Sequence, residues 1–193
     1  MLKTANLSYK FDDKYIFSGL DLEFTHQNIF KLIGDNGTGK STFLKILSGI
    51  YRNYEGEISF DEDKTIYYSG HNSALKNNLS VLENIELDIR LTTHNTEEID
   101  LILNKLSMTE FSETHVENLS EGQKRKVNIL SFIISKADLY LLDEPFNNLD
   151  VKTSEILSKA FTEKINSGSK IIFSSHDRTE DDFSSIDMNS YCS

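Results

Sequence analysis

The feature that most constrains this chain is a glycine-rich stretch, residues 34–42, that follows a short apolar run. The run Ile29–Ile33 is typical of a buried strand, and the next residues, Gly34-Asp-Asn-Gly-Thr-Gly-Lys-Ser-Thr42, match the pattern G-x-x-x-x-G-K-[ST]. The glycines let the backbone curl so that its N–H groups face a phosphate, an approach that a Cβ would crowd. The pattern assigns Lys40 to the β and γ phosphates and Ser41 to Mg²⁺. We therefore expect a strand, a phosphate-binding loop and a helix in succession, with a nucleoside triphosphate as the ligand.

The charge and composition of the chain limit the kinds of partner that it is expected to bind. The 193 residues include 31 acidic and 20 basic side chains, a net charge of −11. Such a surface repels phosphate backbones and anionic lipid, so we expect neither nucleic acid nor direct lipid insertion, although an acidic balance can also serve solubility alone. Cys192 is the only cysteine, and no apolar run approaches the ~20 residues of a spanning helix. We expect a cytosolic protein whose membrane role comes through another subunit.

Apolar periodicity predicts an α/β fold with a mostly parallel sheet. Strands are expected at Leu139–Leu142, a continuous apolar run, and at Lys170–Ser175, the last clear strand. Alternation over Leu20–Phe24 indicates a half-buried strand, and residues 73–135 show mostly helical periodicity. Strands that alternate with helices favour a parallel sheet. We predict one domain, residues 1–193, with a helical subdomain at about 73–135.

Two acidic residues follow the strand Leu139–Leu142, where a parallel sheet presents its ligands. Asp143 is expected to hold Mg²⁺ and Glu144 to orient the attacking water, since phosphoryl transfer needs positioning and charge neutralisation. An acidic pair that caps a helix is the alternative. His176 ends the next strand and could donate to the γ phosphate, but a lone histidine there is more often structural.

The stretch Leu119–Gln123 predicts the start of a helix. Ser120 and Gln123 fit a capping box, S-x-x-Q, which explains them structurally. Gly122 in the first turn would also expose backbone N–H groups at a positive helix end, which suits phosphate. Spacing alone leaves both roles open. The basic run Lys124–Lys126 is expected to be a solvated helix face.

Together these motifs resemble the ATP-binding cassette (ABC) ATPases. Residues 34–42 resemble the Walker A motif, 139–144 Walker B, 119–123 the family signature, 147–150 the D-loop, and His176 the switch histidine. The resemblance implies a P-loop NTPase fold with an antiparallel β subdomain and a helical subdomain. It implies catalysis by Lys40, Glu144 and His176, Mg²⁺ contacts from Ser41 and Asp143, and ATP contacts from Phe11, Gly34, Asp35, Asn36, Gly37, Thr38, Gly39, Lys40, Ser41, Thr42, His71, Ser120, Gly122 and Gln123.

The resemblance also implies how such a chain works. Two cassettes face each other head to tail, so that ATP on the loop of one is closed over by Ser120 and Gly122 of the other. Because this chain carries one cassette, we expect a homodimer, for which a two-fold arrangement is simplest. Phe11 aligns with the aromatic residue that stacks on adenine, and Tyr9 is the alternative.

One departure from the family pattern is informative. The segment Tyr67–Asn72 places His71 where most cassettes carry the Q-loop glutamine. Histidine there, with Leu79–Asn84 following, is similar to the haem-exporter ATPases of cytochrome c maturation, the CcmA type. That resemblance implies an integral membrane permease docked near residues 71–78, and a peripheral position on the cytoplasmic face of the inner membrane. Milder departures are Glu121 in the signature, which could slow turnover, and Asn148 in the D-loop.

Two other functions remain open from sequence. The chain could power another small exporter, one for lipid, drug or peptide. It could instead be a soluble cassette that acts on ribosomes or DNA. Such proteins usually join two cassettes in one chain or carry a basic or coiled-coil insertion, and this sequence shows neither.

Overall fold

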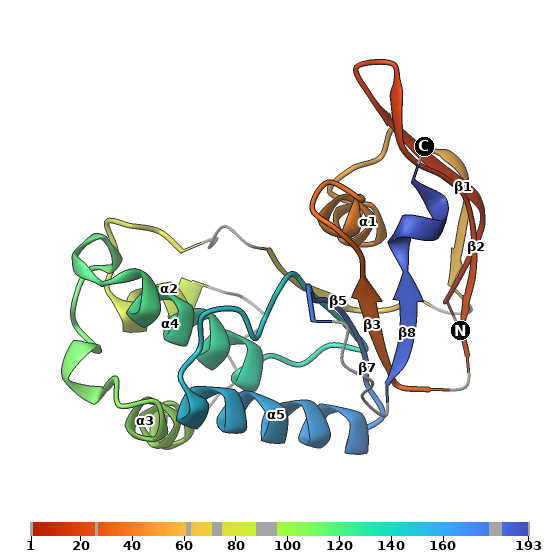
Figure 1. Ribbon diagram of the computed structural model, residues 1–193. Helices are drawn as coiled ribbons and strands as arrows, with labels where there is room; N and C mark the ends of the chain where they lie inside the picture. The colour runs from red at the N-terminus through yellow and green to blue at the C-terminus, as the bar shows by residue number, and fades with distance from the viewer. Residues whose placement is uncertain are drawn as a thin grey trace. The chain divides into compact units, whose positions relative to one another are not determined.

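The computed structural model describes residues 2–25, 27–60, 63–70, 75–87, 96–177 and 183–192 (Figure 1). The chain divides into two compact units. The first comprises residues 1–71, 137–145 and 164–193, and the second comprises 72–136 and 146–163. The expected helical segment 73–135 falls in the second unit, which also takes in residues 146–163.

The first unit contains a parallel sheet in the strand order β5-β6-β7-β3-β8. Its strands are β3 (Ile29–Ile33), β5 (Ile66–Ser69), β6 (Leu139–Leu142), β7 (Lys170–Ser174) and β8 (Ser184–Asp187). All four residues of β6 are buried, as a strand covered on both faces requires. In the register, Leu142 pairs with Phe173 and Leu32 with Ser174, so β6, β7 and β3 end at the same edge.

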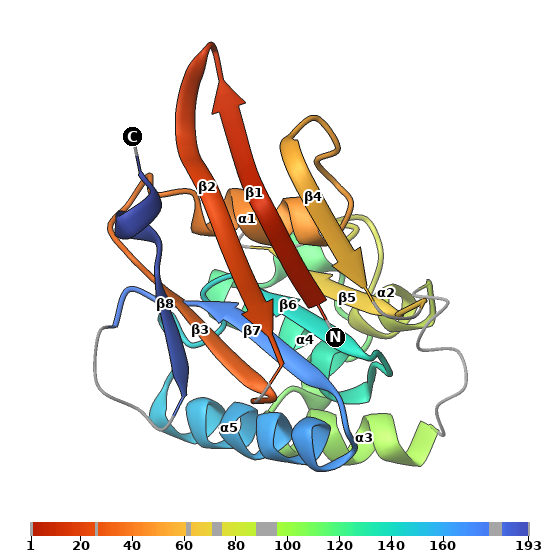
Figure 2. The ribbon, with the colours of Figure 1, turned by 90° about the vertical axis from the view of Figure 1, so that its right-hand side faces the viewer.

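A second, antiparallel sheet in the same unit has the order β2-β1-β4 (Figure 2). It is built from β1 (Leu2–Phe11), β2 (Lys14–Phe24) and β4 (Glu55–Phe60). Asp12 and Asp13 join β1 to β2 with φ of 47° and 62°, both in the left-handed region that a two-residue I′ turn requires. On β2, Leu20 and Phe24 are buried, which confirms the alternation predicted for this strand.

Helix α1 (Lys40–Leu47) lies between the two sheets and completes the core of the first unit (Figure 1). Its Phe43 is fully buried, with its ring centroid 6.2 Å from that of Phe17 and 6.4 Å from that of Phe24. Phe24 in turn meets Phe30 of β3 edge to face at 4.8 Å. These rings connect the antiparallel sheet, the helix and the parallel sheet in one apolar cluster.

The second unit is helical. It contains α2 (Val81–Leu87), α3 (Thr96–Lys105), α4 (Glu121–Ile134) and the larger part of α5 (Val151–Asn166), with short 3₁₀ turns at Thr109–Phe111 and Val116–Asn118. The periodic residues of α3, Ile99, Ile102 and Leu103, are buried, so the predicted apolar face is confirmed. At the start of α5 the Asp150 carboxylate accepts from the Thr153 backbone N–H at 2.7 Å and from the Thr153 hydroxyl at 3.0 Å, and these bonds lower the pKa of Asp150.

The C-terminal part of the first unit differs from the sequence prediction. β7 is not the last strand, because β8 follows it and pairs with β3 on the other side. A short 3₁₀ helix, η3 (Met188–Tyr191), comes next. Ser184-Ser-Ile-Asp187 has one apolar residue and no periodicity, so its strand structure depends on pairing with β3 rather than on a local pattern.

The phenylalanine cluster predicts a large stability difference between two Phe→Ala substitutions. Phe43→Ala removes a fully buried ring and should lower the free energy of unfolding by about 3–5 kcal/mol. Phe11→Ala, at a residue 61% exposed, should change it by less than about 0.5 kcal/mol. Chemical denaturation of both variants measures this, and equal losses would contradict the described core.

Candidate phosphate-binding site

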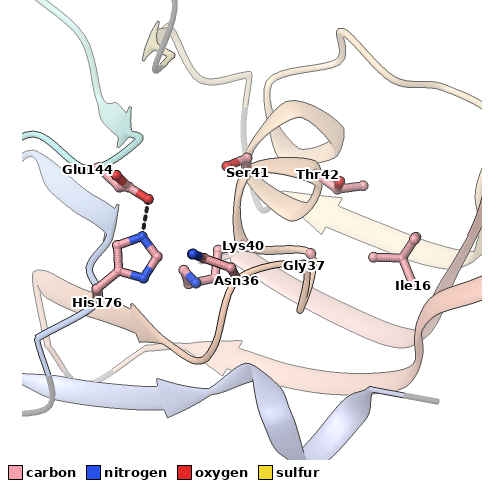
Figure 3. Close-up of a pocket in the computed structure, with 9 residues that line it drawn as sticks. Ile16, Asn36, Gly37, Lys40, Ser41, Thr42, Glu144 and His176 are labelled. Atoms are coloured by element: carbon pink, nitrogen blue, oxygen red, sulfur yellow. Dashed lines mark hydrogen bonds and ion pairs between the residues drawn. The ribbon is translucent and has the colours of Figure 1, made fainter.

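A cavity of about 270 Å³ lies against the glycine-rich loop of the first unit (Figure 3). Its lining residues are Ile16, Asn36, Gly37, Gly39, Lys40, Ser41, Thr42, Glu144 and His176. All but Ile16 are residues that the sequence predicts for the site. In Figure 3, Glu144 and His176 lie at one end of the group and Ile16 lies at the other, with the loop between them.

The loop depends on glycine for both conformation and space. Gly34, Gly37 and Gly39 have φ of 147°, 88° and 89°, in the region that residues with a Cβ rarely adopt. A Cβ on Gly39 would lie 2.7 Å from Cδ1 of Phe17 and 2.8 Å from Cγ2 of Ile16. Gly39 therefore lets the start of α1 pack directly against β2.

Helix α1 begins at Lys40, beside the cavity. The N–H groups in the first turn of a helix have no partner within the helix, and no side chain in the described part of the chain caps α1. Lys40, Ser41 and Thr42, which form that first turn, all line the cavity. Unpaired N–H groups and the positive end of the helix dipole together make this a suitable position for a phosphate.

Lys40 is folded back onto its own loop. Its side chain is buried, and its Nζ donates to the carbonyl oxygens of Gly34 at 2.7 Å and Asp35 at 2.9 Å. Burial lowers the pKa of Lys40, while the carboxylates of Glu144, Asp143 and Asp35 act in the opposite direction. An ammonium has three donors, so these bonds brace the loop and leave one donor for a ligand.

Two acidic residues follow β6 at the edge of the sheet. Asp143 is buried and accepts a hydrogen bond from the Ser174 hydroxyl at 2.6 Å. Glu144 has φ of 50°, and its backbone N–H donates to the Ser174 Oγ at 2.8 Å. The Oε1 of Glu144 contacts Nε2 of His176 (Figure 3). The structure thus brings Lys40, Glu144 and His176 to one cavity, as the sequence predicts.

The surroundings of Asp143 fit a hydrated divalent cation. Mg²⁺ usually takes one or two protein oxygens together with phosphate and water, and Ser41 and Asp143 offer such oxygens. The hydroxyl of Tyr68 is buried without a hydrogen-bond partner among the described residues. Burial, with a smaller effect of Asp143, raises the pKa of Tyr68 to about 12. A buried hydroxyl of this kind is ordinarily satisfied by water, so it suits a hydrated ion.

The signature segment lies in the second unit and begins α4. The backbone N–H of Ser120 donates to Gln123 Oε1 at 2.8 Å, and the backbone N–H of Gln123 donates to Ser120 Oγ at 3.3 Å. The predicted capping box is therefore confirmed. A Cβ on Gly122 would meet no described atom within 4 Å, so packing within the described chain does not require this glycine.

Some predicted residues have no contact in this cavity. Phe11 lies at the end of β1 beside the β1–β2 turn, 61% exposed, and is not one of the lining residues, whereas Ile16 is. Tyr9 stacks on Tyr51, with ring centroids 5.7 Å apart. Contact of Phe11 with adenine stays a prediction. His71 lies outside the described residues.

Besides Ile16, two residues at the site were not predicted from the sequence. Ser174 bonds both acidic residues, and Asn189 of η3 accepts the backbone N–H of Asp35 at 3.2 Å through its Oδ1. Ser174 sits two positions before His176, which could have drawn attention to it. Asn189 is 154 residues from Asp35 and gave no local signal.

Comparison with known proteins finds similar sequences that cover most of this chain. The sequence profile of the family described as "ABC transporter" matches residues 17–147. The cytochrome c biogenesis ATP-binding export protein CcmA of Idiomarina loihiensis is 31% identical over 188 residues, covering 91% of this chain and 85% of the relative. An uncharacterized ABC transporter ATP-binding protein of Methanocaldococcus jannaschii is 32% identical over 179 residues, covering 91% and 68%.

A solved structure has the same fold. It is a dimeric ATP-binding cassette in a post-hydrolysis state, bound to ADP and Pi. It matches with a TM-score of 0.73 and 26% sequence identity, covering 92% of this chain and 88% of that one. The match confirms the predicted fold class.

The packing at Gly39 gives a testable prediction. Gly39→Ala should weaken nucleotide binding by about 10-fold or more, because the added methyl must displace Phe17, Ile16 or the loop. Gly49→Ala is the matched control: Gly49 also has positive φ, 77°, but a Cβ there meets no described atom within 4 Å. Calorimetric titration with ATP compares the two, and unchanged affinity in Gly39→Ala would contradict the loop geometry.

Proposed function

The chain belongs to the ABC transporter family and is an ABC-type ATPase, and we propose that it powers the haem exporter of cytochrome c biogenesis. The observation that carries the proposal is the cavity in which the phosphate loop, Glu144 and His176 meet. The choice of exporter rests on similarity to CcmA over 91% of the chain.

The residues of the cavity have separate roles in hydrolysis. The loop N–H groups and Lys40 hold the β and γ phosphates and neutralise their charge. Glu144 takes a proton from the water whose oxygen attacks the γ phosphorus, while the bond from that phosphorus to the oxygen of ADP breaks. His176 contacts the Glu144 carboxylate and fixes its direction toward the cavity.

Two oxygens of the chain would hold the metal ion. The Ser41 hydroxyl lies in the first turn of α1, and the Asp143 carboxylate lies at the end of β6. When bound, Mg²⁺ would neutralise charge on the phosphate oxygens. The Ser174 hydroxyl keeps Asp143 in one orientation for that contact.

We infer a homodimer in which ATP is shared between two copies. Ser120 and Gly122 of one copy would close over the nucleotide on the loop of the other. Glycine inside a helix lowers stability by about 0.5–1 kcal/mol relative to alanine, and Gly122 has no described packing neighbour that would require it. Close approach of a second molecule would explain why glycine occupies this position. A solved cassette of this fold is dimeric and bound to ADP and Pi, which supports the inference that this chain forms a dimer.

The membrane partner is part of the proposal. Among the described residues, no helix is both long and apolar enough to span a membrane. The segment just before α2 is held in shape by Asn84, whose side chain accepts from the Lys76 N–H at 2.6 Å and donates to the Ser80 carbonyl oxygen at 2.8 Å. A fixed, exposed segment of this kind suits the docking of a permease, with the chain peripheral on the cytoplasmic face of the inner membrane.

A second candidate is the ATPase of another small exporter. An uncharacterized ABC transporter ATP-binding protein is 32% identical to this chain and CcmA is 31% identical, so sequence identity alone does not select the haem exporter. The cavity residues would act in the same way for either exporter, so the partner separates the two candidates.

The choice of exporter is tested by purification from membranes. The tagged full chain should co-purify with integral membrane subunits from detergent-solubilised membranes, and the complex should contain haem. Membrane subunits without haem would favour the second candidate. Recovery of ribosomes or DNA, with no membrane subunit, would contradict both.

The role of Glu144 predicts a variant that binds ATP but does not use it. Glu144→Gln keeps the shape of the side chain and removes the base, so it should cut hydrolysis by about 10²–10⁴-fold. With ATP, this variant should elute as a dimer in size-exclusion chromatography. Lys40→Ala is the contrasting variant and should fail to bind ATP. A Glu144→Gln chain that stays monomeric and hydrolyses ATP normally would overturn the assignment.

A further inference from the structure

Ser174, the last residue of β7, links the two acidic residues of the site. It is buried, at 1% exposed. Its hydroxyl donates to Asp143 Oδ1 at 2.6 Å, and its Oγ accepts from the backbone N–H of Glu144 at 2.8 Å. One small side chain therefore satisfies a polar group of each acidic residue.

The direction of these bonds follows from chemistry alone. A carboxylate oxygen can only accept and a backbone N–H can only donate, whereas a serine hydroxyl has one donor and two acceptor sites. The Ser174 proton must therefore point to Asp143, which leaves a lone pair for the Glu144 N–H. Among side chains of this size, alanine and glycine offer neither function, and cysteine offers both only weakly.

Strand β7 and the residues just after it hold Glu144 at both ends. The backbone N–H of Glu144 is bonded to Ser174 in β7, and its carboxylate contacts His176, two residues further along the chain. Glu144 has φ of 50°, a conformation that persists only where surrounding contacts hold it. The bond to Ser174 is such a contact, and it determines where the side chain of Glu144 begins.

Asp143 is held in a similar way from two strands. Its backbone N–H donates to the Ser69 carbonyl oxygen of β5 at 2.8 Å, and its carboxylate accepts from Ser174 of β7. Rotation of the carboxylate would break the 2.6 Å bond and leave a buried hydroxyl unpaired. The oxygen not bonded to Ser174 is thereby kept in a fixed position.

We propose that Ser174 is a positioning residue that keeps the Asp143 carboxylate and the Glu144 backbone in register for hydrolysis. The inference rests on the proposed roles of Asp143 and Glu144. It adds a residue whose side chain is hydrogen-bonded to the two acidic residues rather than to the nucleotide loop or Lys40. Loss of its hydroxyl should therefore reduce turnover while leaving ATP binding to the loop intact.

The test is a pair of variants that differ only in the hydroxyl. Thr and Val have nearly the same shape and both suit a strand, so Ser174→Thr retains the two bonds and Ser174→Val removes them. In the full chain with ATP and Mg²⁺, Ser174→Val should lower kcat by about 10–100-fold, as the loss of a supporting hydrogen bond commonly does. Ser174→Thr should restore kcat to within about threefold of the wild-type chain, and KM for ATP should change little in either.

A neighbouring serine provides the matched control. Ser175 is half-buried, and its Oγ accepts from the backbone N–H of Asp177 at 3.0 Å. Ser175→Ala should leave kcat unchanged. A melting temperature for each variant shows that the compared chains are folded.

Two further measurements separate positioning from general destabilisation. In a Glu144→Gln background, Ser174→Val should lower the residual rate much less than it does in the wild-type chain, because its effect passes largely through Glu144. Calorimetry without turnover should show that Ser174→Val and Ser174→Thr bind ATP with the same affinity in the presence of Mg²⁺.

Equal kcat in the Thr and Val variants, or full additivity with Glu144→Gln, would overturn the role of Ser174. Either result would leave the proposed function standing. A wild-type chain that does not hydrolyse ATP, or a Lys40→Ala chain that binds ATP normally, would instead contradict the proposed function itself.

Discussion

The parallel register of β6, β7 and β3 is the constraint on which the site depends. Leu142 pairs with Phe173, and Leu32 pairs with Ser174, so the residues that follow these strands emerge at one edge of the sheet. A slip of one residue would move every side chain of a strand to the opposite face of the sheet. Since all of β6 and nearly all of β7 are buried, apolar packing fixes the register. The acidic residues, Ser174 and the phosphate loop thus reach the same place because the core permits one alignment.

The core also shapes the loop directly. Phe17 packs against Phe43 on one side and leaves no room for a Cβ on Gly39 on the other. The ring that stabilises the contact between β2 and α1 therefore also sets how closely the start of α1 approaches β2. Both the stability of the fold and the binding of a ligand depend on this contact. Substitutions in the aromatic cluster should therefore also change nucleotide binding at the cavity.

Local patterns predicted the elements that carry their own signal. The bounds of β3 and β6 agree with the apolar runs, and the capping box at Ser120 agrees because its residues are three positions apart. β8 was missed because its residues acquire a strand conformation only beside β3. Ser174 and Asn189 were missed as site residues for a related reason: their partners lie about 30 and 154 residues away, and only the register brings them together. The functional pattern was easier to recognise than the scaffold that supports it.

The most direct measurement is a structure of the chain with an ATP analogue and Mg²⁺ bound. We predict that the terminal phosphate lies within hydrogen-bond distance of Lys40 Nζ and the N–H groups at the start of α1. A water between that phosphate and the Glu144 carboxylate would complete the predicted arrangement. A nucleotide bound elsewhere, or a terminal phosphate out of reach of both Lys40 and Glu144, would contradict the account.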